Sequence, residues 1–250
     1  MNDRPTLEVP VDSLESARHA VGFVDRLEVC SDLETEGWTP DLELLREVVD
    51  LVGSGTTGVV ALIRPRLGTS GTGREIGDFV ADDECLEASL ADIESAADAG
   101  ADSVAIGPLL PDGRIDRDAC SKLVAQAHRR GLSVSFLRTI DLAPDREEAI
   151  RTLAGTGVVR VLTAGIHGWE TEASPLELRA ETCAEDVLRA ASIARELGRA
   201  PLDIMIGGGI RSTNATGFLR RTPHLHSSCR REGCFDREEL LDLCAAIEPG

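Results

Sequence analysis

The chain has 250 residues and a formal net charge of −18, so it is long enough for one large domain and too acidic to bind a nucleic-acid backbone through a basic surface. It contains no run of roughly 18 apolar residues, which argues against a membrane-spanning helix. The first residues, Met1-Asn2-Asp3-Arg4-Pro5, lack the basic and apolar regions of a secretion signal, so we expect a cytoplasmic protein.

Short apolar segments alternate with amphipathic segments along the chain. The segments that we predict as strands are 6–11, 26–30, 58–63, 103–107, 133–137, 158–162, 202–206 and 223–227. The clearest predicted helices are 42–52, 86–99, 117–130, 146–155, 185–197 and 236–247. This alternation predicts an α/β fold, a closed parallel TIM-type (β/α)8 barrel, as a single domain over residues 1–250.

An open, doubly wound sheet is the structural alternative. Such a sheet usually carries a glycine-rich turn directly after its first strand. Here the first predicted strand is followed by Val11-Asp12-Ser13, and no segment has the composition of a linker. The sequence therefore favours the barrel.

Two arginines follow the third predicted strand. Arg64-Pro65-Arg66 closes an apolar run, and proline ends the strand because it holds the preceding residue extended and lacks a backbone donor. Two guanidinium groups at a strand end predict a site for a small anion, either phosphate or carboxylate. The alternative is that each arginine pairs with one of the many acidic residues of the chain.

Two long loops are also expected. Residues 67–78, rich in glycine, threonine and serine, follow the arginine pair and either fold over a bound ligand or form a plain loop. Residues 166–182 follow the sixth predicted strand and contain Trp169 with several glutamates.

The loops after the strands build the active site of a TIM-type barrel, and those after the seventh and eighth strands often bind phosphate. The polar residues expected at these strand ends are Glu8, Glu28, Arg64, Arg66, Arg138, Asp141, Thr163, Asn214, His226, Ser227 and Ser228. Gly207-Gly208-Gly209, after the seventh strand, would offer backbone N–H groups to an anion. A tight turn is the other explanation for the three glycines.

Two glutamates lie inside predicted strands. A carboxylate that points into a barrel is costly to bury unless it pairs with an arginine or a metal. Glu28 is nearer its strand end and is the better candidate for a general base whose pKa is raised by burial. For Glu8, a structural Arg–Glu network inside the barrel is the favoured explanation.

His224 and His226 alternate on the last predicted strand and therefore share one face. Two histidines at this spacing can bind a metal, although the sequence identifies no third ligand. His226, beside Ser227 and Ser228, would instead hydrogen-bond a substrate or relay a proton. We expect His224 to be structural.

Cysteine and lysine usage limits the chemistry further. The seven cysteines have no CxxC spacing, so a disulfide framework is not expected, and only Cys30 and Cys229 lie beside strand ends. Lys122 is the one lysine among 26 basic residues and lies within a predicted helix, which disfavours a Schiff-base aldolase. The acidic, lysine-poor composition suits a host with concentrated internal salt, whereas a GC-rich genome would also favour arginine.

Ordered motifs along nearly the whole chain resemble the CutC family of copper homeostasis proteins. The motifs are Arg26-Leu27-Glu28-Val29-Cys30, Glu36-Gly37-Trp38-Thr39-Pro40, Ile63-Arg64-Pro65-Arg66, Gly77-Asp78-Phe79, Arg160-Val161-Leu162-Thr163-Ala164-Gly165, Ile206-Gly207-Gly208-Gly209-Ile210-Arg211 with Asn214, and His226-Ser227-Ser228. The resemblance implies a TIM-type barrel, often assembled as a homo-oligomer, with a polar pocket at the strand ends. It also implies a role in copper tolerance or trafficking, with a copper ion as partner or cofactor.

The chain departs from the family pattern where copper would bind. Val9-Pro10-Val11 stands where family members commonly have a cysteine, and Phe136-Leu137-Arg138 replaces a Phe-His-Arg motif. Because Cu(I) favours thiolate and imidazole ligands, the usual ligands are partly missing, and Cys30 and His226 are the candidates that remain.

Three functional classes follow: a copper-handling protein, a lyase or isomerase acting on a small phosphorylated or carboxylated metabolite, and a noncatalytic sensor or scaffold. In the second class the anion ligands are Arg64, Arg66 and the glycine loop. The proton-transfer group is Glu28 or Asp141, and the group that stabilises negative charge is Arg138 or Asn214. The residues that the chain keeps are anion ligands and those that it lacks are soft-metal ligands, which favours the second class.

Overall fold

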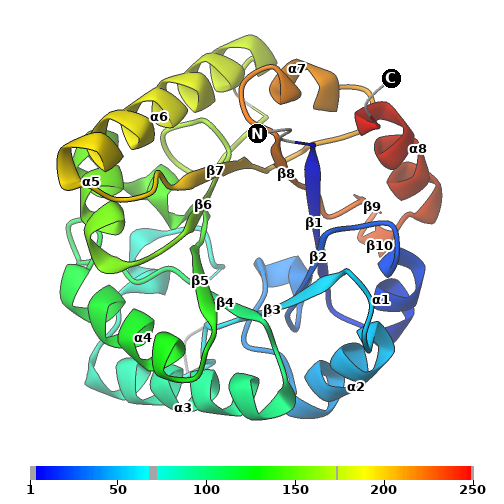
Figure 1. The fold of residues 1–250 in the computed structure, drawn as a ribbon, viewed down its shortest axis with the longest axis horizontal. Coiled ribbons are helices and arrows are strands. Elements are labelled where there is room, and N and C mark those ends of the chain that lie inside the picture. The colour runs from blue at the N-terminus through cyan, green and yellow to red at the C-terminus, as the bar shows by residue number, and fades with distance from the viewer. Residues whose placement is uncertain (1–3, 68–71, 173, 249–250) are drawn as a thin grey trace.

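The computed structural model describes residues 4–67, 72–172 and 174–248, and a closed barrel of eight parallel strands lies at its centre. Each strand pairs with the next in chain order, and β8 pairs with β1 (Figure 1). The strands are β1 (Thr6–Val11), β2 (Arg26–Val29), β3 (Gly58–Leu62), β4 (Ser103–Ile106), β5 (Ser133–Phe136), β6 (Arg160–Thr163), β7 (Asp203–Ile206) and β8 (His224–His226). The predicted (β/α)8 barrel is confirmed.

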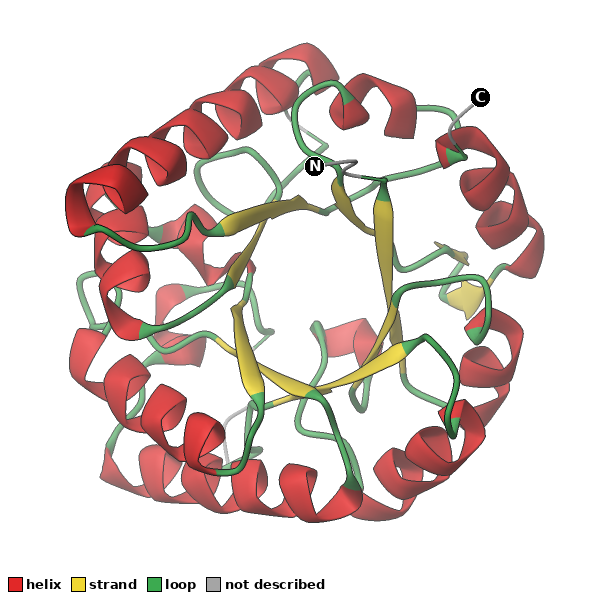
Figure 2. Ribbon diagram, in the orientation of Figure 1, coloured by secondary structure: helices red, strands yellow, loops and turns green. Residues whose placement is uncertain are grey.

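Helices surround the ring of strands (Figure 2). They are α1 (Leu14–Ala20), α2 (Leu42–Val52), α3 (Asp83–Ala99), α4 (Arg117–Arg129), α5 (Arg146–Thr156), α6 (Leu176–Leu197), α7 (Ala215–Leu219) and α8 (Arg237–Ile247). The loops contain three 3₁₀ turns, η1 (Leu33–Thr35), η2 (Ile76–Phe79) and η3 (Arg138–Leu142), and a hairpin of β9 (Arg230–Arg231) and β10 (Cys234–Phe235). None of the described helices combines the length and apolar character needed to cross a membrane.

Strand residues alternate between two environments, because successive side chains of a strand point to opposite faces of the sheet. In β1, Leu7 and Val9 pack in the main core between the barrel and the helices, whereas Glu8 forms an ion pair with Arg26 of β2. A second, smaller apolar cluster consists of Cys30, Val60, Leu62 and Ala105. The barrel interior is thus apolar toward β3 and β4 and charged toward β8 and β1.

The predicted strands agree closely with the structure, and the largest difference is at β6, predicted over 158–162 and observed as Arg160–Thr163. The predicted loop 166–182 is wrong at its end, because α6 begins at Leu176 rather than at 185. Leu176 and Leu178 are 42% and 54% exposed, so the first turn of α6 has no apolar face that periodicity could detect. The short helix α1, capped by Ser13, is also absent from the predicted elements.

Candidate functional site

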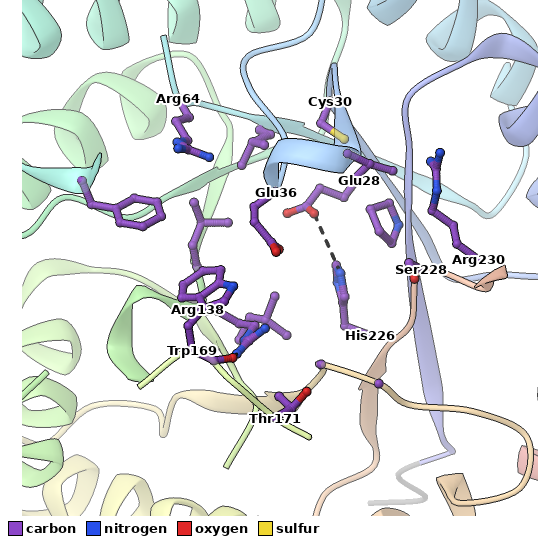
Figure 3. Close-up of a pocket in the computed structure, with 18 residues that line it drawn as sticks. Glu28, Cys30, Glu36, Arg64, Arg138, Trp169, Thr171, His226, Ser228 and Arg230 are labelled. Atoms are coloured by element: carbon purple, nitrogen blue, oxygen red, sulfur yellow. Dashed lines mark hydrogen bonds and ion pairs between the residues drawn. The ribbon is translucent and has the colours of Figure 1, made fainter. Parts of the chain in front are cut away.

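A pocket of about 300 Å³ opens at the C-terminal mouth of the barrel (Figure 3). It is lined by Pro10, Glu28, Cys30, Leu33, Glu36, Leu62, Arg64, Phe79, Leu137, Arg138, Leu162, Trp169, Thr171, Gly208, Gly209, His226, Ser228 and Arg230. The loops that follow parallel strands meet at this end, so residues far apart in the sequence come together here.

The predicted site residues divide into two groups. Those that line the pocket are Glu28, Cys30, Arg64, Arg138, Gly208, Gly209, His226 and Ser228. Those that lie outside its lining are Glu8, Arg66, Asp141, Thr163, Gly207, Asn214 and Ser227. Arg64, after β3, and Gly208, after β7, therefore lie at the same mouth of the barrel.

His226 lies between two buried glutamates. Its Nδ1 is 3.1 Å from Glu8 Oε1, and its Nε2 is 4.0 Å from Glu28 Oε2, the contact drawn as a dashed line in Figure 3. The sheet register explains this arrangement, because His226 pairs with Glu8 across β8 and β1, and Glu28 pairs with Pro10, the next residue of β1 on the same face. Arg26 Nε donates to Glu8 Oε2 at 2.7 Å, so Glu8 lies in an Arg–Glu network beneath the pocket.

The two glutamates have opposite pKa shifts. Burial raises the pKa of Glu8, but the hydrogen bond from His226 and the charge of Arg26 outweigh burial and lower this pKa to about 2. At Glu28 burial dominates and raises the pKa to about 7, against the charge of His226. Burial lowers the pKa of His226, but its hydrogen bond to Glu8 and the charges of both glutamates outweigh burial and raise it. At neutral pH Glu8 is therefore ionised, whereas the pKa of Glu28 lies close to neutral pH.

Arg64 is buried in the pocket wall, and burial lowers its pKa although the charges of Asp78 and Glu36 act in the opposite direction. Its side chain donates from Nη1 to the carbonyl oxygens of Thr35 at 3.2 Å and Gly37 at 3.0 Å. The guanidinium lies over the rings of Trp38 and Phe79, 4.0 and 4.9 Å from their centroids. Among the described residues, Nε and Nη2 have no hydrogen-bond partner and Arg64 forms no ion pair. Two unpartnered donors on a buried cation are suited to an anion.

Gly73, in the loop before η2, lies against the side chain of Arg64. Gly73 has a φ of +75°, and a Cβ at this position would lie 2.5 Å from Arg64 Nη1, so this close approach requires glycine. Asp78 holds the segment, because its Oδ2 accepts the backbone N–H groups of Gly73, Arg74 and Glu75. Of the predicted loop 67–78, residues 68–71 lie outside the described residues.

Arginines and aromatic rings alternate along one side of the pocket. Arg138 donates from Nη2 to the carbonyl of Trp169 at 2.8 Å and lies 4.4 Å from the centroid of its ring. Trp169 stacks with Phe79 at a centroid distance of 5.9 Å, and Phe79 in turn contacts Arg64. Both tryptophans of the chain take part in this array. The rings position both guanidinium groups by cation–π contact, and Arg138 is in addition paired with Asp141 at 3.3 Å.

The glycine turn after β7 contributes to the rim of the pocket. Gly208 and Gly209 have φ values of +68° and +80°, which other residues rarely adopt, and a Cβ on Gly208 would lie 2.9 Å from Thr171 Cγ2. Arg179 of α6 holds the turn by donating to the carbonyl oxygens of Gly207 and Gly208. The positive φ values favour glycine at positions 208 and 209, and both of these glycines line the pocket.

Asp141 and Thr163 belong to a buried cluster centred on Arg146. Arg146 Nη1 lies 3.1 Å from Asp141 Oδ1, and its Nε lies 3.0 Å from Asp186 Oδ2. Thr163 Oγ1 accepts from Arg146 Nη2 and donates to Asp141 Oδ1. We call Arg146, Asp141, Asp186 and Thr163 the Arg146 cluster. The carboxylate of Asp141 is thus bonded within this cluster, and its Oδ2 also lies 3.3 Å from Nε of Arg138, which lines the pocket.

The other predicted residues outside the lining also have protein partners. Arg66 pairs with Asp32 at 2.5 Å, and both side chains are more than a third exposed, at 56% and 37%. Asn214 hydrogen-bonds to the backbone near the glycine turn through both atoms of its amide. Ser227 donates to the carbonyl of Ile210.

Arg230 and Glu36 line the pocket but are absent from the predicted set. Arg230 Nη1 lies 2.9 and 3.0 Å from the two carboxylate oxygens of Asp12, which follows β1. Its place in the loop after the last strand, close to Ser228, is the signal that could have identified it. Glu36 pairs with Arg74 at 3.0 Å across two loops, and no strand end marks it in the sequence.

The pocket does not fit a copper(I) site of thiolate and imidazole. Burial, with the negative charges of Glu28 and Asp12, raises the pKa of Cys30 well above its ordinary value and so disfavours the thiolate. Burial also raises the pKa of Cys229 to about 11, and Cys229 lies outside the pocket lining. Within the described ranges, no three histidine, cysteine, aspartate or glutamate side chains are grouped so as to hold a metal ion.

Comparisons with family models, known sequences and solved structures all point to the same family. The model of the CutC family matches residues 5–231. A family protein CutC of Vibrio atlanticus is 34% identical over 250 residues, covering 98% of this chain and 88% of that protein. The human copper homeostasis protein cutC homolog is 36% identical over 227 residues, covering 90% and 73%. A crystal structure of CutC from Streptococcus agalactiae has a TM-score of 0.75 at 23% identity, covering 90% of this chain and 98% of that chain.

Proposed function

This chain belongs to the CutC family. We propose that it binds a small anionic metabolite and that Glu28 and His226 transfer protons to and from this ligand. The observation that supports this most is the pair of buried glutamates around His226, whose pKa values are pushed apart to about 2 and about 7. Such a separation provides a fixed charge beside a group that exchanges protons near neutral pH. The relatives' name refers to copper homeostasis, but the donors in this pocket suit acid–base chemistry better than copper binding.

Glu8 is a positioning residue in this proposal. As an ionised acceptor it keeps a proton on His226 Nδ1, which leaves Nε2 to exchange a proton on the side of Glu28. Glu28 accepts a proton from the ligand as a carboxylate and returns one as a carboxylic acid. This chemistry fits an isomerase or a lyase. A Schiff-base mechanism does not fit, because Lys122, the only lysine, is exposed on α4.

Arginines and the glycine turn would bind the anion. Arg64 has two donors without hydrogen-bond partners among the described residues, and a phosphate or carboxylate would supply acceptors for both. Arg138 and the turn at Gly208 and Gly209 line the same pocket. The same groups would stabilise negative charge that develops on the ligand during proton abstraction.

Binding is tested by thermal unfolding with inorganic phosphate and a panel of phosphorylated and carboxylated sugars. We expect at least one compound to raise the melting temperature of the wild type by several degrees and to have no effect on Arg64→Ala, because ligand binding stabilises the folded state by mass action. Arg151→Ala is the matched control, since Arg151 is an exposed arginine of α5 outside the pocket. A broad screen in which wild type and Arg64→Ala respond alike would refute the anion site.

Proton transfer is tested with a stabilising compound in deuterated water. The wild type should exchange a carbon-bound hydrogen of the ligand for deuterium, which NMR detects without knowledge of the final product. Glu28→Gln should slow this exchange by about 100-fold or more, because it removes the general base. A ligand that binds tightly but neither exchanges nor reacts would identify a sensor instead of an enzyme.

A further inference from the structure

A second, smaller cavity adjoins the pocket. Its volume is about 120 Å³, and Arg64, Phe79 and Leu137 line both cavities and so lie between them. In Figure 3, Arg64 lies at the edge of the main pocket, away from His226 and Glu28. The arginine with unpartnered donors is therefore also the residue at which the two cavities meet.

The smaller cavity is lined by apolar residues together with several charged ones. Its apolar residues include Trp38, Ile63, Pro65, Ile106 and Leu123. Asp78, Asp82 and Glu84 also border it, and their negative charges would repel an anion. The apolar part of a ligand that packs against these side chains leaves water, which favours its binding. The cavity thus favours an uncharged apolar group up to about the size of one ring.

We propose that the smaller cavity is a specificity subsite for an apolar or aromatic substituent of the same ligand whose anionic group binds in the main pocket. The inference rests on the proposed function, because it takes the anion at Arg64 as given. The substrate class is then an organic phosphate or carboxylate that carries one ring or a short branched chain. Sugar phosphates without such a substituent would leave the subsite empty.

Cys85 provides a reporter inside the subsite. It lines the smaller cavity near the start of α3 and is partly exposed, so a thiol reagent can reach it. Burial raises the pKa of Cys85, so labelling is done at mildly alkaline pH. Cys234 on β10 is exposed and lies outside both linings, which makes it the internal control.

The experiment compares methyl phosphate with phenyl phosphate, and acetate with phenylacetate, by isothermal titration on the full chain. We expect the phenyl compound of at least one pair to bind about 10-fold tighter than its methyl counterpart, because the ring leaves water. It should also slow the reaction of Cys85 with N-ethylmaleimide, followed by mass spectrometry, and leave Cys234 unaffected. Cys85→Phe, which fills the subsite, should remove the advantage of the phenyl compound and keep the methyl compound bound; Cys234→Phe should change neither.

The possible failures are distinguishable. If the small anions bind through Arg64 but the phenyl compounds bind no tighter and do not protect Cys85, the subsite is refuted and the anion pocket stands. If Cys85→Phe keeps the phenyl advantage, the ring binds elsewhere and the subsite is again refuted. If none of the four anions binds, the proposed anion pocket fails, and this inference fails with it.

Discussion

Two buried arginines at the same end of the barrel have opposite surroundings. Arg146 is 5% exposed and bonded to Asp141, Asp186, Thr163 and the carbonyl of Ile166. Arg64 is 6% exposed, yet it is held by two aromatic rings and two carbonyl oxygens and leaves Nε and Nη2 without partners among the described residues. The two guanidinium groups are therefore buried to nearly the same extent, but only Arg146 has hydrogen-bond partners for each of its nitrogen atoms.

Buried carboxylates repeat this contrast. Asp141 accepts from Arg146, Thr163 and the backbone N–H of Ala164. Glu28 has His226 Nε2 at 4.0 Å as its nearest charged partner among the described residues, and burial raises its pKa. Charges with complete sets of partners hold the fold together, whereas charges with incomplete sets are free to respond to a ligand or a proton.

The largest effect should follow loss of Arg146. Arg146→Met leaves Asp141 and Asp186 buried without their cation, so we expect the free energy of unfolding to fall by about 3–5 kcal/mol. Urea unfolding followed by circular dichroism measures this. Arg64→Met is the contrast, and it should stay within about 1 kcal/mol of the wild type, because removing the buried unpartnered donors offsets the loss of two carbonyl hydrogen bonds and the cation–π contacts. Equal losses in the two variants would mean that burial, and not pairing, sets the cost of losing each arginine.

The next effect concerns pH and Glu28. Because the folded pKa of Glu28 is about 7 against an ordinary value of 4.5, the folded state prefers the protonated acid. The free-energy penalty of ionising the buried Glu28 is absent below the pKa of the unfolded state and complete above that of the folded state. The free energy of unfolding should therefore fall by about 1–3 kcal/mol as pH rises from about 5 to 8. The raised pKa of His226 acts in the same direction.

Glu28→Gln should flatten this fall, measured as urea midpoints across the same pH range. Glu87→Gln is the control, since Glu87 is an exposed residue of α3. The lowered pKa of Glu8 acts in the opposite direction and at lower pH, where its stabilisation is lost as pH falls from about 4.5 toward 2. A wild type whose stability rises between pH 5 and 8 would contradict the pKa raised at Glu28.

Sequence predicted the fold better than it predicted the partners of each charge. The strands could be located because each is an apolar run bounded by turns, and barrel topology then placed Arg64, His226 and Gly208 at one mouth. The start of α6 could not be located from the sequence, because Leu176 and Leu178 are exposed there and do not form a periodic apolar face.

Arg146 illustrates what sequence could not show. It opens α5 directly after its capping residue Asp145 and reads as an exposed first-turn residue, whereas its partner Asp186 lies 40 residues later on α6. Asp141 was accordingly predicted to transfer protons, although its carboxylate is bonded within the Arg146 cluster. A polar residue at a strand end can be placed near the mouth of the barrel from sequence alone. Its hydrogen-bond partners depend on tertiary contacts between helices, which the sequence does not show.

The smallest effect is expected at Arg66. This exposed and paired arginine tests whether anion binding needs the buried, unpartnered donors of Arg64 or only a positive charge near the pocket. Its side chain is 56% exposed, pairs with Asp32 and lies 4.8 Å from the ring centroid of Trp38. Because solvent screens such a pair, Arg66→Ala should lower the free energy of unfolding by at most about 1 kcal/mol and weaken anion binding by less than about threefold. Titration of the compound that stabilises the wild type, against Arg66→Ala and Arg64→Ala in parallel, measures this. Equal losses of affinity would show that charge at the rim governs binding, and the unpartnered donors of Arg64 would then have no special role.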